Sequence, residues 1–246
     1  MQGGSRRSAI YASLDREHAD VKAFLYAKDW HKILVHEPSG LTLDKVKELN
    51  FNFPAPLDQT NISVNYSDEW LGLGDAKCTD AVFLENVRQA MTTGEPGFSF
   101  NFGDKSNETL RNACTEVTSE DDSDVCNLGS INLGNIENIE EMRNVVNLAS
   151  KFLVCGTVRA DLPYEKVYEV RQKNRRLGLG LMGLHEWLLK RGATYEVTPE
   201  LHKWLKVYKD ESEISANEHC DRLYLSKPVA YRAIAPTGTI GILAGT

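Results

Sequence analysis

The segment Asn112-Ala113-Cys114-Thr115-Glu116 carries an amide, a thiol and a carboxyl group at every second position. If it forms a strand, these three side chains project from one face, because alternate residues of a strand face the same way. Successive groups would then lie about 6.6 Å apart, at about 3.3 Å of rise per residue. An amide can hold a hydroxyl group, a carboxylate can accept its proton, and a thiol can react between them. The segment therefore predicts a site for a sugar-sized substrate; a half-buried edge strand with a core cysteine is the alternative.

A second thiol, Cys126, lies twelve residues beyond Cys114 and opens the segment Cys-Asn-Leu-Gly-Ser-Ile-Asn-Leu, residues 126–133. A redox role needs another thiol within disulfide reach, with the two Cα atoms less than about 7 Å apart. The sequence does not identify that partner, so an inert, buried cysteine is the alternative.

The cysteines of the chain are odd in number and widely spaced, and no Cys-x-x-Cys pair occurs. They are Cys78, Cys114, Cys126, Cys155 and Cys220. This pattern favours free thiols in the cytoplasm and argues against a structural zinc site.

A third candidate is the loop Ala-Pro-Thr-Gly-Thr-Ile-Gly at residues 235–241. Its two hydroxyl groups and its glycine backbone could present donors to a phosphate, above all if a helix begins there. The loop has no lysine, so it is not a Walker-type loop. A plain Pro-Thr-Gly turn is the alternative.

Two further patterns are rejected as sites. Residues 178–183 satisfy G-x-G-x-x-G, but the charged segment 171–176 precedes them where a dinucleotide fold needs a buried strand. We therefore expect these glycines to serve close helix packing or a turn. His185 has no second histidine four residues later, which excludes a metalloprotease helix. The acidic stretch 120–124 is interpreted as a solvated loop.

The elements that must position these groups alternate between strands and helices. We expect strands at 8–13, 97–102 and 229–235, with a second buried segment at 240–244. We expect helices at 15–28, 43–49, 81–91, 139–154, 179–190 and 199–223, the last with Thr198 as its N-cap and Pro199 as its first residue. The rest of 36–62 is expected to be a long loop. This order predicts an α/β protein.

Composition narrows the class of protein. The 246 residues are 41% hydrophobic and 26% charged, which is typical of a globular protein. The net charge of -7 argues against a broad nucleic-acid or anionic-membrane surface, since both need an excess of Lys and Arg. No run of 18 apolar residues occurs, so no transmembrane helix is expected, and the first eight residues lack the apolar core of a signal peptide.

Four segments in this order resemble the catalytic chain of a ribonucleotide reductase: 112–116, 126–133, 175–188 and 232–240. The opening residues 2–9 are similar to the glycine-rich turn before a barrel strand in that family. The resemblance covers nearly the whole chain and is least clear at 36–75. It implies a ten-stranded α/β barrel with a central finger loop. Residues 1–246 would form a single partial barrel domain, incomplete at both ends.

By motif position, Cys114 would become a thiyl radical that takes the 3′ hydrogen from the ribose. Glu116 would accept the proton of the 3′ hydroxyl, Asn112 would hydrogen-bond the substrate, and Cys126 would be one of two thiols that reduce the 2′ carbon. The resemblance also implies further substrate-binding residues, which are Gly3, Gly4, Ala113, Thr115, Pro236, Thr237, Gly238, Thr239 and Ile240.

The same resemblance implies the cofactor and the partners. The family's second reducing cysteine lies upstream of the Gly-Gly turn, so we expect this chain to need the remaining segments of a reductase polypeptide. The radical source is expected to be adenosylcobalamin, with a separate metal-containing radical subunit as the alternative. No residue here is identified as a ligand of either, and no metal site is predicted. A ribonucleotide di- or triphosphate would be the substrate, and a thioredoxin-like or glutaredoxin-like protein the reductant.

Two other hypotheses stay open. The chain could be a non-catalytic scaffold or assembly piece of such an enzyme. It could also be an unrelated thiol–disulfide protein that uses Cys114 and Cys126.

Overall fold

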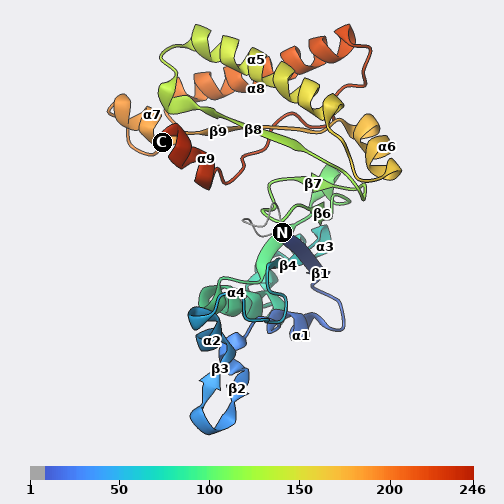
Figure 1. Cartoon of the computed structure of the whole chain (residues 1–246), viewed down its shortest axis with the longest axis vertical. Helices are drawn as coiled ribbons and strands as arrows, with labels where there is room; N and C mark the ends of the chain where they lie inside the picture. Colours follow the sequence, from blue (N-terminus) through green and yellow to red (C-terminus); the bar gives the residue numbers. More distant parts are fainter. Residues whose placement is uncertain (1–8) are drawn as a thin grey trace. The chain divides into compact units, whose positions relative to one another are not determined.

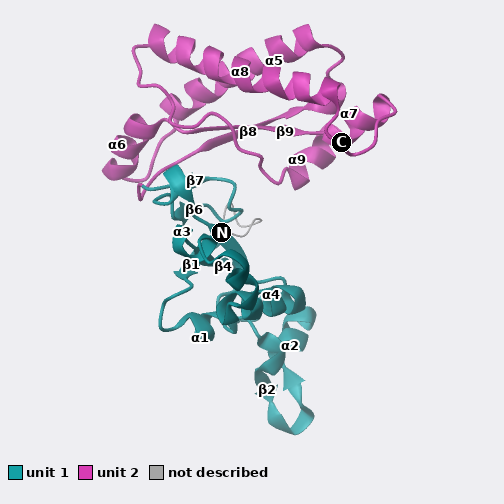
Figure 2. Cartoon of the chain, turned by 180° about the vertical axis from the view of Figure 1, so that it is seen from behind, with its two compact units in different colours: residues 1–120 teal, residues 121–246 magenta. Residues whose placement is uncertain are grey.

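The computed structural model describes residues 9–246. The chain forms two compact units, an N-terminal unit that ends at Glu120 and a C-terminal unit of residues 121–246 (Figure 2, teal and magenta). Each unit has its own core and is described by itself.

The N-terminal unit is built on a parallel sheet of β1 (Ile10–Asp15), β4 (Thr60–Tyr66) and β5 (Gly97–Phe100), in the order β1-β4-β5. Ile10 lies opposite Thr60, and Ser63 lies opposite Gly97. Most residues of the central strand β4 are buried, including three in a row, as expected for a parallel strand that is covered on both faces.

Short elements surround this sheet. The helices are α1 (Val21–Leu25), α2 (Leu43–Leu49), α3 (Asp68–Leu71) and α4 (Ala81–Thr93). Two small antiparallel pairs join β2 (Leu34–His36) to β3 (Leu41–Thr42) and β6 (Leu110–Arg111) to β7 (Thr118–Ser119). The core centres on Val64, Tyr66 and Trp70, and the rings of Tyr66 and Trp70 lie 4.7 Å apart. Aromatic rings bury large apolar areas, so their packing stabilises this core.

The C-terminal unit pairs β8 (Asn127–Asn132) with β9 (Leu177–Met182) in parallel, with Asn127 opposite Leu177. The long helices α5 (Ile139–Arg159) and α8 (Pro199–Arg222) lie side by side next to this strand pair (Figure 1). Three shorter helices complete the unit: α6 (Glu165–Asn174), α7 (Leu184–Lys190) and α9 (Gly238–Ala244).

Apolar stripes of α5, α7 and α8 form the core of the C-terminal unit. Met142 and Val146 of α5 are fully buried, and Trp187 of α7 meets Trp204 of α8 edge to face at 5.1 Å. The hydroxyl of Tyr208 donates to the backbone carbonyl of Leu179 in β9, and burial raises the pKa of Tyr208 to about 12. A helix is thereby fixed to the strand pair by a satisfied buried polar group.

Several sequence predictions are confirmed. The α/β class is correct, as are the helices at 43–49 and 81–91, and the predicted helix at 139–154 forms and extends to Arg159. The hydroxyl of Thr198 accepts from the amide of Leu201 at 3.1 Å, so α8 begins at Pro199 as its capping residues predict. Strands β1 and β5 lie where strands are expected.

Other predictions are wrong. The helix expected at 15–28 is only Val21–Leu25, because β1 continues to Asp15. The rest of 36–62, expected to be a long loop, contains β3 and the start of β4. Residues 240–244 are not a buried segment but part of α9, where Ile242 and Leu243 are more than four-fifths exposed.

The largest error is the helix expected at 179–190. Its first part is β9, and only Leu184–Lys190 is helical. The segment 229–235, expected to be a strand, runs beside β9 and bonds to it at a few positions, but it does not form a regular strand. There Leu177 N–H donates to Ala230 at 2.9 Å and Leu179 N–H to Tyr231 at 3.1 Å. A Cβ on Gly180 would lie 2.6 Å from the carbonyl oxygen of Ala233, so glycine permits this close approach of two backbones.

Within residues 9–246, no helix has both the length and the apolar character needed to cross a membrane.

Candidate active site

The segment that carries Cys114 is the tip of the β6–β7 hairpin, not a strand. The backbone amide of Thr115 donates to the carbonyl of Asn112 at 3.0 Å, and Thr115 takes a left-handed conformation with φ of 66°. The side-chain oxygen of Asn112 accepts from the amide of Val117 at 3.2 Å. These bonds close a tight turn over residues 112–117.

The strand expected for residues 112–116 is therefore wrong, and so is the argument that alternation aligns the three side chains. An asparagine side chain can bond to nearby backbone, which competes with a strand and favours a turn. The turn still keeps Asn112, Cys114 and Glu116 within five residues of each other. The three residues are therefore carried by one tight turn and not by the face of a strand.

Three contacts hold this hairpin to the sheet of its unit. The side-chain amide of Asn61 in β4 donates to the carbonyl of Ala113. The guanidinium of Arg111 donates to Asn101 Oδ1 at 2.9 Å and to the Phe100 carbonyl at 3.1 Å. The tip is thus tied to two of the three parallel strands, which limits its freedom.

Cys114 and Glu116 differ in exposure. Cys114 is a free, exposed thiol at the tip. One oxygen of the half-buried Glu116 carboxyl group, Oε2, is shielded from solvent and has no hydrogen-bond partner among residues 9–246. A shielded acceptor without a donor is costly, so this oxygen is suited to receive a hydrogen bond from a ligand.

Cys126 belongs to the C-terminal unit and comes immediately before β8. It is half-buried and not disulfide-bonded. A Cβ placed on Gly178 of β9 would come within 2.9 Å of its sulfur, so the thiol lies directly against a glycine. Two glycines of the rejected G-x-G-x-x-G pattern, Gly178 and Gly180, therefore serve close strand packing and not the expected helix packing. The third, Gly183, has φ of 71° at the start of α7, so the expected turn is present there.

The acidic stretch before Cys126 is not the solvated loop that its composition predicts. Asp124 Oδ2 accepts from Arg176 Nε at 2.9 Å, and both side chains are more than nine-tenths buried. Asp121 accepts from Lys173 and Asn174, and these bonds lower its pKa below the usual range. The charged segment 171–176 is the complementary signal in the sequence that could have identified these partners.

Residues 236–240 span the start of α9, which begins at Gly238. Thr237 adopts φ of 54°, and no side chain caps the first turn of α9. The first amide groups of a helix have no partner inside the helix, so they point outward as donors. The helix that the phosphate hypothesis requires is present.

The predicted site residues fall in three places. Asn112, Cys114 and Glu116, with Ala113 and Thr115, lie in the N-terminal unit. Cys126 and residues 236–240 lie in the C-terminal unit. Gly3 and Gly4 lie outside the described residues.

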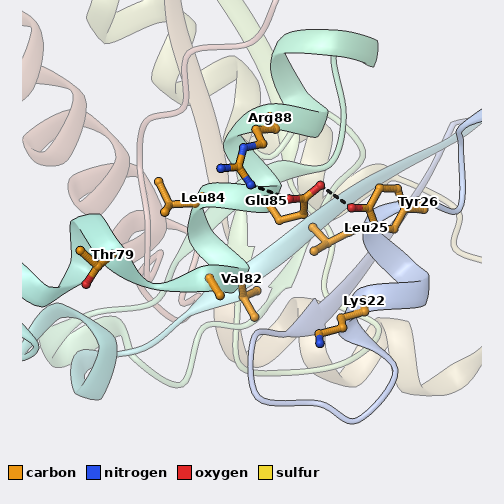
Figure 3. Close-up of a pocket in the computed structure, with 9 residues that line it drawn as sticks. Lys22, Leu25, Tyr26, Thr79, Val82, Leu84, Glu85 and Arg88 are labelled. Atoms are coloured by element: carbon orange, nitrogen blue, oxygen red, sulfur yellow. Dashed lines mark hydrogen bonds and ion pairs between the residues drawn. The ribbon is translucent and has the colours of Figure 1, made fainter.

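A cavity of about 420 Å³ lies between α1 and α4 in the N-terminal unit (Figure 3). At its edge the Glu85 carboxylate accepts from Tyr26 and, at 2.9 Å, from Arg88, while Leu25 and Val82 give it an apolar wall. None of the predicted site residues that the structure describes lines it. It is separate from the candidate active site.

Residues 9–246 contain no group of three or more His, Cys, Asp or Glu side chains that could hold a metal ion. The α1–α4 cavity is not lined by any of the shielded, unpartnered polar atoms. No chemical step is therefore assigned to a cofactor held by these residues.

Comparison with known families gives a match to the barrel domain of ribonucleotide reductase over residues 80–204, about half of the chain. The matched range includes the Cys114 turn, Cys126 and β9. Three of the four segments that carry the resemblance, 112–116, 126–133 and 175–188, lie within it.

Two relatives are similar along most of the chain. A Mycobacterium phage D29 protein, provisionally named an adenosylcobalamin-dependent ribonucleoside-triphosphate reductase, is 32% identical over 76% of this chain and 30% of its own length. A vitamin B12-dependent ribonucleoside-diphosphate reductase of Thermoplasma acidophilum is 26% identical over 99% of this chain and 35% of its own length. The chain thus spans about a third of the length of these relatives.

A solved structure shares the fold. The crystal structure of a B12-dependent, class II ribonucleotide reductase superposes with a TM-score of 0.69 at 18% identity, over 96% of this chain and 33% of that chain. Motif order, family match and fold agree, and the chain belongs to the ribonucleotide reductase family, with residues 80–204 in its barrel domain.

Proposed function

We propose that this chain supplies catalytic residues of a ribonucleotide reductase, which converts ribonucleotides to 2′-deoxyribonucleotides for DNA synthesis. The observation that carries the proposal is the turn at 112–117 in a chain of this family. It presents the Cys114 thiol two residues from a carboxylate whose shielded oxygen has no partner. The names of the relatives support the same activity.

The reaction begins at Cys114. As a thiyl radical it removes the hydrogen atom from the 3′ carbon of the ribose, which leaves a carbon radical and a thiol. Glu116 accepts the proton of the 3′ hydroxyl, and its shielded Oε2 is the acceptor that this step needs. Asn112 hydrogen-bonds the substrate from the start of the same turn.

Reduction then takes place at the 2′ carbon. The 2′ hydroxyl leaves as water, and two thiols together give two electrons and two protons and become a disulfide. Cys126 is one of these thiols. Cys114 returns a hydrogen atom to the 3′ carbon and is again a radical, and Glu116 returns the proton to the 3′ oxygen. A thioredoxin-like or glutaredoxin-like protein reduces the disulfide before the next turnover.

Residues 236–240 hold the phosphates of the substrate. The uncapped first turn of α9 offers backbone donors, and Thr237 and Thr239 add hydroxyl groups. In this proposal Gly3 and Gly4 also bind the phosphates, and Ala113 and Thr115 bind the substrate at the catalytic turn.

Both units belong to one partial barrel domain, residues 1–246, which acts together with further reductase segments in the cytoplasm. The chain spans about a third of the length of these relatives, which supports a role as one part of a larger enzyme. A closed barrel interior would protect the radical from water and from other hydrogen donors. Turnover by the purified 246-residue chain, without added polypeptide, would contradict this part of the proposal.

Adenosylcobalamin is the proposed source of the radical, since two similar relatives and the matching solved structure carry its name or that of vitamin B12. When bound, it supplies a carbon radical that starts the chemistry. The alternative source is a separate subunit with a metal centre. Activity with that subunit and without adenosylcobalamin would favour the alternative.

The test replaces Cys114 by Ser in the assembled reductase with adenosylcobalamin and measures deoxyribonucleotide formation. We expect a loss on the order of 10⁴-fold, as for other residues that act as one catalytic unit. Cys78→Ser is the matched control, because Cys78 is also an exposed, free thiol of the N-terminal unit, and it should keep full activity. Full activity of Cys114→Ser would instead identify the chain as a scaffold.

A further inference from the structure

The sulfur of Cys126 lies in a space that exists because residue 178 has no side chain. A Cβ on Gly178 would be 2.9 Å from that sulfur, 2.4 Å from Leu128 Cδ2 and 3.3 Å from Ala233 Cβ. Contacts this short require a neighbour to move. Leu128 lies directly opposite Gly178 in the β8–β9 pair, so the strand register brings the glycine and the thiol together.

A second contact fixes the backbone just before the thiol. Asp124, two residues before Cys126, accepts from Arg176 at 2.9 Å and from Asn174 at 3.0 Å through the same oxygen, Oδ2. Its other oxygen, Oδ1, accepts from the amide of Val125 at 2.8 Å. Both oxygens of this carboxylate are thus used to hold the chain that leads to Cys126.

The ion pair is buried on both sides, with side-chain exposures of 8% for Arg176 and 6% for Asp124. The loss of one partner would leave an uncompensated charge away from water, which is strongly unfavourable. Asp121 extends the same connection through Lys173, at 2.8 Å, and Asn174, at 2.9 Å. The pairing is therefore specific in geometry and not a loose surface attraction.

These contacts share one origin. Arg176 lies at the end of the α6–β9 connection, and Gly178 lies two residues later in β9. Their partners are also two residues apart: Arg176 contacts Asp124, and Gly178 lies against Cys126. We propose that Arg176 and Gly178 are positioning residues that set where the Cys126 sulfur lies, Arg176 through the backbone at Asp124 and Gly178 by leaving space for the thiol.

This inference rests on the proposed function, in which Cys126 is a reducing thiol. Such a sulfur must meet the 2′ carbon and then bond a second sulfur at about 2.05 Å. A displacement of about 1 Å at a reacting group can cost on the order of a hundredfold in rate. A thiol at the end of a freely moving acidic loop would not meet both demands.

The test measures how fast iodoacetamide alkylates each cysteine of the folded 246-residue chain, by peptide mass spectrometry. Gly178→Ala pushes the sulfur out of its space beside β9, so the alkylation rate of Cys126 should rise by about tenfold or more. The matched control is Gly180→Ala. It lies on the same face of β9 and would meet the Ala233 carbonyl at 2.6 Å, but it does not touch Cys126. In that control the Cys126 rate should stay within about twofold.

A second set of variants addresses the ion pair and does not depend on the folding of Gly178→Ala. The double variant Asp124→Asn with Arg176→Gln removes both charges and leaves no buried ion without a partner. It should raise the Cys126 rate by about tenfold. The single variant Arg176→Lys keeps a cation within reach of Asp124. Its Cys126 alkylation rate should lie between those of the parent chain and the double variant.

Buried Cys220 separates positioning from a general loss of stability. If the substitutions only loosen the unit, Cys220 and Cys126 accelerate together. Positioning predicts acceleration of Cys126 while Cys220 stays slow. Unchanged Cys126 rates in Gly178→Ala and in the double variant, or equal acceleration of both thiols, would overturn the inference.

The proposed function is tested separately. Cys126→Ser in the assembled reductase should abolish turnover, and retained turnover would refute the reducing role of Cys126. The alkylation rates need no turnover, so they decide the positioning of this thiol whichever way that experiment ends.

Discussion

Asn112 has two tasks in the catalytic turn, and they use different atoms. Its side-chain oxygen accepts from Val117 N–H and closes the turn that presents Cys114. Its contact with the substrate, in the proposed function, uses the amide donors. An aspartate has the acceptor but lacks the donors, so substitution at this position can separate folding of the turn from substrate binding.

We therefore predict different results for two substitutions in the assembled reductase. Asn112→Ala loses a hydrogen bond worth about 1 kcal/mol and should speed hydrogen exchange at Val117 N–H about fivefold. Asn112→Asp should keep the exchange rate of Val117 near that of the parent and still raise KM. Equal KM values for Asn112→Asp and the parent would contradict the substrate contact.

His219 is a second residue whose chemistry can be tested. Its ring nitrogen Nε2 lies 3.3 Å from the sulfur of Cys155, between α8 and α5. Burial, and then the positive charges of Arg222 and Lys151, lower the pKa of His219. The unfolded chain binds this proton more readily, so the free energy of unfolding should fall as the pH drops below about 6.5.

His219→Gln removes that titration. We predict that urea unfolding, compared between pH 7.5 and pH 5, shows a smaller loss of stability in His219→Gln than in the parent chain. His185→Gln is the control for the loss of a histidine side chain at an exposed position. An identical pH slope in His219→Gln and the parent would contradict the linkage.

Single residues also show the limits of sequence analysis. The alternating groups at 112, 114 and 116 predict a strand, but the segment forms a turn, because the local hydrogen bonds of Asn112 outweigh strand propensity. Asp124 and Arg176 are 52 positions apart, and only the pairing of β8 with β9 brings them together. No local pattern contains that information.

At the scale of elements, helices with clear periodicity and capping are predicted well, and apolar strands are predicted poorly. Thr198 and Pro199 locate the start of α8 within the sequence itself. The run Leu-Gly-Leu-Gly-Leu-Met of β9 has apolar residues that fit a helix as well as a strand. The short-range pattern cannot separate helix from strand. Glycine is needed here because atoms of Cys126, Ser130 and Ala233, which belong to other segments, leave no room for a Cβ.

The cap of α8 yields a prediction at this scale. Thr198→Ala removes the acceptor for Leu201 N–H and should destabilise the first turn of α8 by about 1 kcal/mol. Thr198→Ser keeps a hydroxyl acceptor and should lose little. Hydrogen exchange of peptides from α8 measures the difference, and equal protection in Thr198→Ala and Thr198→Ser would contradict the capping role.

For the whole molecule, the α/β class follows from the alternation of elements, and the family follows from four ordered motifs. The open parallel strands of each unit are consistent with a barrel domain of which this chain forms part. The placement of the thiol-bearing segments depends on contacts between distant strands, so sequence patterns alone do not supply it.

The central claim is that Cys114 removes the 3′ hydrogen of a ribonucleotide. The most direct measurement supplies the assembled reductase, with adenosylcobalamin, with a ribonucleotide that carries deuterium at the 3′ carbon. Intact enzyme should form deoxyribonucleotide more slowly from the 3′-deuterated substrate than from the unlabelled one, and Cys114→Ser should form none from either. Deoxyribonucleotide formed by Cys114→Ser at the parent rate would contradict the account.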